Sequence, residues 1–157
     1  MADIGIGAEA PDFDLPRDGG GRVSLAEFRG KPLVLFFYPK DDTAGCTAES
    51  IGFTELAGEF EKAGAGLVGM SPDSVKCHER FIRKHSLAVA LASDEEKTVL
   101  QTYGVWKQKS MYGRTYMGVE RTTFLIRRDG TIATIWQKVK VAGHAETVLA
   151  AVRNLAA

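Results

Sequence analysis

Cysteine chemistry is the first possibility that this sequence raises, because the chain has only two cysteines, Cys46 and Cys77. Cys46 follows the apolar run at residues 33–38 and opens a segment with helical periodicity. A thiol at a strand-to-helix junction faces backbone N–H groups, and the helix dipole there favours a negative charge. Since the thiolate is the reactive form of cysteine, this position predicts a nucleophilic Cys46. The competing interpretation is a small, buried hydrophobic side chain.

The elements that must hold Cys46 in place alternate between strands and helices. Apolar runs predict buried strands at 33–38 and 67–70. Helices are expected at 47–62, 75–85 and 95–103 and from about 144, and further strands at 88–91, 122–127 and 131–136. The last two strands flank Arg128-Asp129-Gly130, which predicts a hairpin. This order predicts an α/β fold in a thioredoxin-like layout, with a mixed central sheet, helices on both faces and an N-terminal β extension.

Composition narrows the class of protein. The 157 residues suit a single domain, expected to span 1–157. Lys and Arg number 20, as do Asp and Glu, so no net charge favours nucleic acid or an anionic membrane as a partner. The N-terminal residues contain neither a basic segment nor a long apolar run, so neither a secretory signal nor a membrane span is expected. Two cysteines make no disulfide scaffold, and a cytoplasmic, reducing compartment is the expectation.

The segment around Cys46 resembles a known active-site loop. Residues 38–47 read Tyr-Pro-Lys-Asp-Asp-Thr-Ala-Gly-Cys-Thr and match the peroxiredoxin pattern Pro-x-x-x-Thr-x-x-Cys. Further matching segments lie at 71–75, 106–118, 120–126 and 143–146. Together they resemble the Q-type peroxiredoxins, also called bacterioferritin comigratory proteins, over nearly the whole chain. The resemblance implies a thiol peroxidase that reduces hydrogen peroxide and organic hydroperoxides, with no metal, haem or flavin because the cysteine itself is oxidised.

The resemblance also implies roles for four residues. Cys46 is the expected peroxidatic nucleophile, whose thiolate attacks the peroxide and becomes a sulfenic acid. Thr43 is expected to hydrogen-bond the peroxide or the thiolate, and Pro39 to shape and shield the pocket. Arg121 is expected to be a fixed cation beside the sulfur, with a planar fork of donors that lysine lacks. The local alternatives are a helix cap for Thr43, a strand terminator for Pro39 and an ordinary edge charge for Arg121.

Two positions near Cys46 depart from the Q-type pattern. Many members have a second cysteine five residues after the peroxidatic one, and this chain has Ile51 there. The commonest intrahelical disulfide of the subfamily is therefore impossible. The residue after Thr43 is often proline in the family and is Ala44 here, which loosens the loop slightly but removes no functional group.

Cys77 is the third departure, and its role stays open. Relatives that resolve the sulfenic acid from this helix do so about a turn later, nearer Ile82. Cys77 either forms an intramolecular disulfide with Cys46, which requires local unwinding, or is a half-buried thiol that packs beside Phe81. In the second case an external thiol reduces Cys46 directly.

The expected partners are peroxide substrates and thioredoxin or a similar dithiol protein as reductant, and the chain is expected to be a monomer. Two other functions compete. A redox sensor or holdase needs only the thiol, so Thr43 and Arg121 together favour catalysis. A thioredoxin-type oxidoreductase needs Cys-x-x-Cys, which this sequence lacks.

The other polar residues predict no further site. His78, His85 and His144 form no metal set with the cysteines, because His78 and His85 are seven residues apart on one predicted helix. Solvated or capping histidines are expected instead. The segment 107–114 is basic and aromatic, but it is short and isolated, so a solvated loop near the active site is preferred to a nucleic-acid surface.

Overall fold

The computed structural model describes residues 4–155 of the chain. Its strands are β1 (Asp14–Pro16), β2 (Arg22–Ser24), β3 (Leu33–Phe37), β4 (Gly66–Ser71), β5 (Ala90–Ser93), β6 (Trp106–Met111), β7 (Arg114–Val119), β8 (Thr122–Ile126) and β9 (Ile132–Trp136). Its α-helices are α1 (Ala44–Glu55), α2 (Ala57–Lys62), α3 (Val75–His85), α4 (Thr98–Thr102) and α5 (His144–Leu155), and two 3₁₀ turns, η1 (Asp18–Gly20) and η2 (Leu25–Phe28), flank β2.

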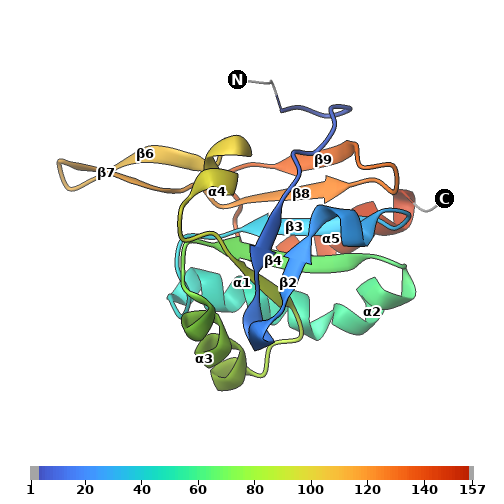
Figure 1. Cartoon of the computed structure of the whole chain (residues 1–157), viewed down its shortest axis with the longest axis horizontal. Helices are drawn as coiled ribbons and strands as arrows, with labels where there is room; N and C mark the ends of the chain where they lie inside the picture. Colours follow the sequence, from blue (N-terminus) through green and yellow to red (C-terminus); the bar gives the residue numbers. More distant parts are fainter. Residues whose placement is uncertain (1–3, 156–157) are drawn as a thin grey trace.

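A five-stranded sheet with the order β5-β4-β3-β8-β9 forms the centre of the molecule (Figure 1). β3 pairs in parallel with β4, and β4 with β5, whereas β8 runs antiparallel to both β3 and β9. The prediction of a mixed sheet is confirmed. The central strand β3 is buried along its whole length, as its uninterrupted apolar sequence indicates.

The alternation of side chains along β3 divides the core into two layers. Leu33, Leu35 and Phe37 face the layer that contains α4 and the N-terminal hairpin β1–β2. Val34 and Phe36 face the other layer, which contains α1, α2, α3 and α5. Helices therefore cover both faces of the sheet, as predicted, and β1–β2 is the predicted N-terminal β extension.

Several element boundaries differ from the sequence-based expectation. The helix predicted at 47–62 is two helices, because Leu56 leaves the helical conformation with ψ of 5°. The first of these begins at Ala44, so Cys46 lies inside its first turn. The predicted helix at 75–85 has the same bounds as α3. No helix within residues 4–155 is long and apolar enough to cross a membrane.

The segment expected to be a solvated loop is instead an antiparallel hairpin of β6 and β7, which projects from the body of the molecule (Figure 1). Tyr112 and Gly113 turn the chain with φ of 52° and 76°. Two consecutive positive φ values are typical of the tight turns whose twist suits a hairpin. The segment carries no strand signal in its sequence because both strands are mostly polar and exposed. We call residues 106–119 the β6–β7 arm.

Candidate active site

Cys46 is the third residue of α1, one loop after β3 ends. Its side chain packs in the core layer that contains α1, α2, α3 and α5, and it is only 1 % exposed. The loop that precedes it brings Thr43 to the N-cap position of α1. The first-turn N–H groups of a helix favour negative charge, so this position suits a thiolate.

Arg121 reaches Cys46 because of the register of the central sheet. Thr122, the first residue of β8, lies opposite Phe37, the last residue of β3. Arg121 therefore stands beside the end of β3 from which the Cys46 loop departs. Its Nη2 donates to Cys46 Sγ over 3.2 Å. A charge-assisted contact of this kind stabilises the thiolate over the thiol.

Glu49 completes this group, although none of the sequence motifs includes it. Arg121 Nη1 donates to Glu49 Oε1 over 2.7 Å, so one guanidinium binds both the sulfur and the carboxylate. Glu49 lies one helical turn after Cys46 and is buried on the same face of α1. Burial raises the pKa of Glu49 to about 7, although Arg121 opposes the shift. The i, i+3 spacing of Cys46 and Glu49 is the signal that could have found this residue.

Gly45 leaves the space that the guanidinium needs. A Cβ atom at this position would lie 3.0 Å from Arg121 Nη2, tighter than about nine in ten such contacts in proteins. A side chain at residue 45 would therefore displace the guanidinium from its present position beside the sulfur.

Thr43 and Pro39 lie on the loop that precedes α1 and Cys46. The Thr43 hydroxyl donates to the Lys40 carbonyl over 2.8 Å and makes no side-chain cap bond to α1. The helix-cap alternative for Thr43 therefore does not apply to its side chain. Pro39 is half-buried and is the second residue after β3.

The loop is fixed to α3 through Asp41. The buried Asp41 carboxylate accepts from the Tyr38 hydroxyl over 2.6 Å, and His78 Nδ1 lies 2.7 Å from its second oxygen. The backbone N–H of Asp41 donates to Asp73 over 2.8 Å. Burial and the Asp41 charge raise the pKa of Tyr38 well above its usual value, so its hydroxyl remains a donor.

Asp42 adds a second, exposed connection between the loop and α3. Its backbone adopts the left-handed conformation with φ of 61°, which costs free energy for a residue with a side chain. Its carboxylate lies 2.7 Å from Lys84 Nζ and 2.9 Å from His85 Nε2. These contacts hold the strained residue in place.

The expectation of solvated or capping histidines is wrong for two of the three. His78 is fully buried, with Nε2 3.0 Å from the Ala92 carbonyl in addition to its contact with Asp41. His144 is the first residue of α5, as expected, but it is buried and lies 2.9 Å from Thr123 Oγ1. Burial, with a smaller effect of Arg121, lowers the pKa of His144 to about 4. Both rings are buried because hydrogen-bond partners distant in the sequence satisfy them.

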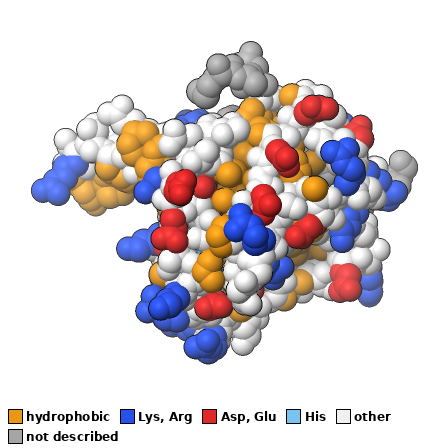
Figure 2. Space-filling model, in the orientation of Figure 1, with side chains coloured by type: hydrophobic (Ala, Val, Ile, Leu, Met, Phe, Trp, Pro, Cys, Tyr) orange, Lys and Arg blue, Asp and Glu red, His pale blue; other side chains and the backbone are white. Residues whose placement is uncertain are grey.

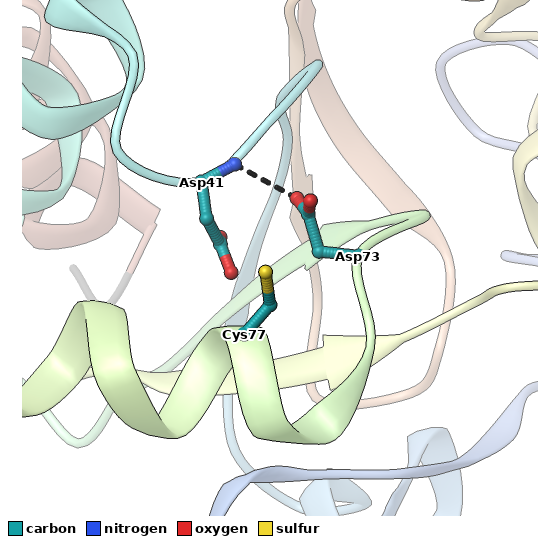
Figure 3. Close-up of side chains that lie close together, drawn as sticks. All are labelled: Asp41, Asp73 and Cys77. Atoms are coloured by element: carbon teal, nitrogen blue, oxygen red, sulfur yellow. Dashed lines mark hydrogen bonds between the residues drawn. The ribbon is translucent and has the colours of Figure 1, made fainter.

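Cys77 is the third residue of α3 and is half-buried. Its sulfur and the carboxylate oxygens of Asp41 and Asp73 lie within 4.8 Å of one another (Figure 3). The carboxylates already accept hydrogen bonds from Tyr38, the Asp41 backbone and Ser71. Arg80 Nη2 lies 3.6 Å from the sulfur, and both thiols of the chain are free.

Comparison with known proteins identifies the family of this chain. Residues 6–135 match the family described as AhpC/TSA. A Xanthomonas campestris protein named peroxiredoxin Bcp is 45 % identical over 155 residues, which cover 98 % of this chain and 97 % of the relative.

Solved structures give the same result. The Xanthomonas campestris bacterioferritin comigratory protein, studied for its alkyl peroxide reduction activity, matches with a TM-score of 0.90 and 43 % identity over the whole of both chains. A mutant of the Xylella fastidiosa PrxQ matches with a TM-score of 0.93 and 35 % identity, again over both whole chains. These matches confirm the predicted thioredoxin-like peroxiredoxin fold. The chain belongs to the AhpC/TSA family and is a peroxiredoxin of the Bcp, or Q, type, a thiol-dependent peroxidase.

Proposed function

We propose that this peroxiredoxin reduces hydrogen peroxide and organic hydroperoxides at Cys46 and is returned to the thiol by thioredoxin or a similar dithiol protein. The observation that carries the proposal is the 3.2 Å contact between Arg121 Nη2 and Cys46 Sγ in the first turn of α1. The alkyl peroxide reduction of the Xanthomonas campestris relative supports the organic substrates.

In the proposed reaction the Cys46 thiolate attacks the terminal oxygen of the hydroperoxide. An S–O bond forms as the O–O bond breaks, and the sulfur becomes a sulfenic acid. The second oxygen leaves as hydroxide or alkoxide and takes up a proton to become water or an alcohol. Arg121 stabilises the negative charge as it moves from the sulfur to the leaving oxygen.

Thr43 and Pro39 act on the substrate side of this reaction. The Thr43 hydroxyl proton already points to the Lys40 carbonyl, so the lone pairs of its oxygen are available to accept from the terminal O–H of the peroxide. Pro39 has no N–H, so it covers the pocket without adding a donor that competes for the peroxide.

Cys77 is the proposed resolving cysteine. Cys46 is too buried to form a disulfide unless the loop before α1 is released from α3. Because Asp41 belongs to this loop, its release also moves the Asp41 carboxylate away from Cys77. The movement that exposes the oxidised Cys46 therefore also removes one negative charge from the thiol that attacks it. Cys77 then forms the S–S bond, and the sulfenic oxygen leaves as water.

The disulfide is tested by peroxide treatment followed by mass spectrometry of a non-reducing digest. The expected product is an intramolecular link between the peptides of Cys46 and Cys77 in a protein that stays a monomer on a gel. If only sulfenic or over-oxidised Cys46 is found while Cys77 is free, then an external thiol reduces Cys46 directly.

We also propose that the protein acts as a monomer in the cytoplasm. Two free, unlinked cysteines suit a reducing compartment. Light scattering after size exclusion tests the first statement, and fractionation of the native cells tests the second.

Peroxidase activity is tested by stopped-flow oxidation of Cys46 with hydrogen peroxide and cumene hydroperoxide. We expect fast oxidation, slowed about tenfold to a hundredfold by Thr43→Val. Thr102→Val is the matched control, because the Thr102 hydroxyl also donates to a backbone carbonyl but lies on α4. Oxidation no faster than that of an ordinary exposed thiol would contradict the proposed function.

A further inference from the structure

The β6–β7 arm collects the exposed apolar side chains of this protein. Five large hydrophobic residues are exposed in the described part of the chain, and four of them lie on the arm: Met111 (56 %), Tyr112 (98 %), Tyr116 (45 %) and Met117 (50 %). Figure 2 shows hydrophobic side chains and cations together on this projection. A concentration of this kind, away from the core, is typical of an interaction surface.

The arm is also basic, although the whole chain has no net charge. It contains Lys107, Lys109 and Arg114 and no acidic residue between 106 and 119. Lys107 pairs with Glu120, whereas neither Lys109 nor Arg114 makes an ion pair within residues 4–155. The surface therefore fits a partner with an apolar patch bordered by carboxylates.

The arm is continuous in the chain with Arg121, which contacts Cys46. β7 ends at Val119, and Arg121, two residues later, donates to the sulfur. Burial and the charge of Arg121 lower the pKa of Lys109, which places this side chain of β6 within electrostatic range of the site. A macromolecule that approaches Cys46 from the side of Arg121 therefore meets the arm.

We propose that the β6–β7 arm is the docking surface for the protein dithiol that recycles Cys46. This inference rests on the proposed function and adds the partner's chemistry: redox-active thiols in an apolar surface ringed by acidic residues. One reductant thiolate attacks oxidised Cys46 to form a mixed disulfide, which displaces water from the sulfenic acid or the thiolate of Cys77. The second reductant thiol then releases Cys46 as a thiol, and the reductant leaves as a disulfide.

The experiment compares a protein reductant with a small one that needs no docking surface. Peroxide consumption by the full chain is measured with bacterial thioredoxin, kept reduced by its reductase, and separately with dithiothreitol. The variants are Met111→Ser/Met117→Ser, which removes apolar surface, and Arg114→Glu, which reverses one charge and keeps the apolar residues. Ile6→Ser is the matched control, because Ile6 is the exposed large hydrophobic residue outside the arm in the described part of the chain.

We expect each arm variant to raise the KM for thioredoxin about tenfold and to leave the rate with dithiothreitol unchanged. Ile6→Ser should change neither. Raising the salt concentration from about 50 to about 300 mM should raise the KM of the wild type more than that of Arg114→Glu.

Other outcomes overturn the proposal in distinguishable ways. An unchanged KM for thioredoxin excludes docking on the arm, and equal losses with both reductants mean that the arm supports the chemistry instead. Binding of the wild type, but not of the arm variants, to phosphatidylglycerol vesicles with an unchanged KM would assign the arm to a membrane surface. A wild type that is inactive even with dithiothreitol would refute the proposed function itself.

Discussion

Cys46 and Cys77 are each the third residue of a helix that follows a strand of the parallel pair β3 and β4, Cys46 in α1 and Cys77 in α3. Both sulfurs therefore lie within the first turn of a helix, where the dipole favours a thiolate. The charged groups close to each sulfur differ. Cys46 is buried against the guanidinium of Arg121, whereas Cys77 is half-buried between the carboxylates of Asp41 and Asp73.

This difference shows that the helix position alone does not select the nucleophile. The cation that distinguishes Cys46 comes from a residue 75 positions away in the sequence. Near Cys77, Arg80 Nη2 lies at the longer distance of 3.6 Å from the sulfur, which also has two carboxylates beside it. We therefore attribute the proposed peroxidatic role of Cys46 to Arg121 and the lower reactivity expected of Cys77 to its carboxylates.

Arg121→Ala should have the largest effect, because it removes the cation that contacts the Cys46 sulfur. We expect oxidation of Cys46 by hydrogen peroxide to slow about a hundredfold to a thousandfold in stopped-flow measurements. Arg121→Lys should recover only part of the rate, since an ammonium lacks the planar fork that binds sulfur and carboxylate together. A rate near that of the wild type in Arg121→Ala would show that the helix position suffices.

Glu49→Gln tests the carboxylate partner of the Arg121 guanidinium through the pH dependence of protein stability. The folded-state pKa of Glu49 is raised from 4.5 to about 7, so the folded protein binds a proton more tightly than the unfolded one. This contribution to stability is fully present below pH 4.5 and is lost as the pH rises to about 7.

The amide that Glu49→Gln introduces is neutral and has no such titration. The unfolding free energy of this variant, measured in urea, should therefore increase relative to that of the wild type between pH 4.5 and about 7, by up to about 3 kcal/mol. A difference that does not vary with pH would contradict the raised pKa.

Gly45→Ala should weaken the contact between Arg121 and Cys46 by displacing the guanidinium. The new Cβ would approach Arg121 Nη2 to 3.0 Å, so the guanidinium must move and the oxidation rate should fall about tenfold. Gly52→Ala is the matched control on α1, where a Cβ would meet Ala145 at an ordinary 3.6 Å. Equal rates in the two variants would mean that the guanidinium has room to adjust.

Asp73→Asn should have the smallest effect and concerns the second thiol. It removes a negative charge near Cys77 but keeps an oxygen that can accept from the Asp41 backbone and Ser71. Alkylation of Cys77 by iodoacetamide should speed up about threefold, with Cys46 unaffected. Asp14→Asn, at the exposed first residue of β1, controls for the general loss of one charge. An equal gain in the alkylation rate of Cys77 in that variant would show that the effect is not local to Asp73.

Local sequence patterns are enough to predict helices and strands that are marked by a cap or by a regular apolar spacing. α3 is predictable to the residue because Ser74 caps it, with its side chain accepting from Cys77 N–H, and because its apolar spacing is helical. The buried strands β3 and β4 are evident from their apolar runs. The β6–β7 arm escapes such prediction because its strands are polar and no core face marks their period.

The site depends on contacts between distant residues. The family resemblance identifies Arg121, but its contact with Cys46 arises from the pairing of Phe37 with Thr122, which no spacing rule reveals. The burial of His78 likewise depends on Asp41, 37 positions away. Glu49 is the exception, since its position one turn after Cys46 is visible in the sequence.

The most direct test compares the two thiols one at a time, with Cys77→Ser and Cys46→Ser proteins oxidised by hydrogen peroxide in a stopped-flow instrument. Our account predicts that the protein retaining Cys46 reacts at least about a thousandfold faster than the protein retaining Cys77, which should react like an ordinary thiol. Similar rates for the two proteins would contradict the claim that Arg121, and not the start of a helix, creates the nucleophile.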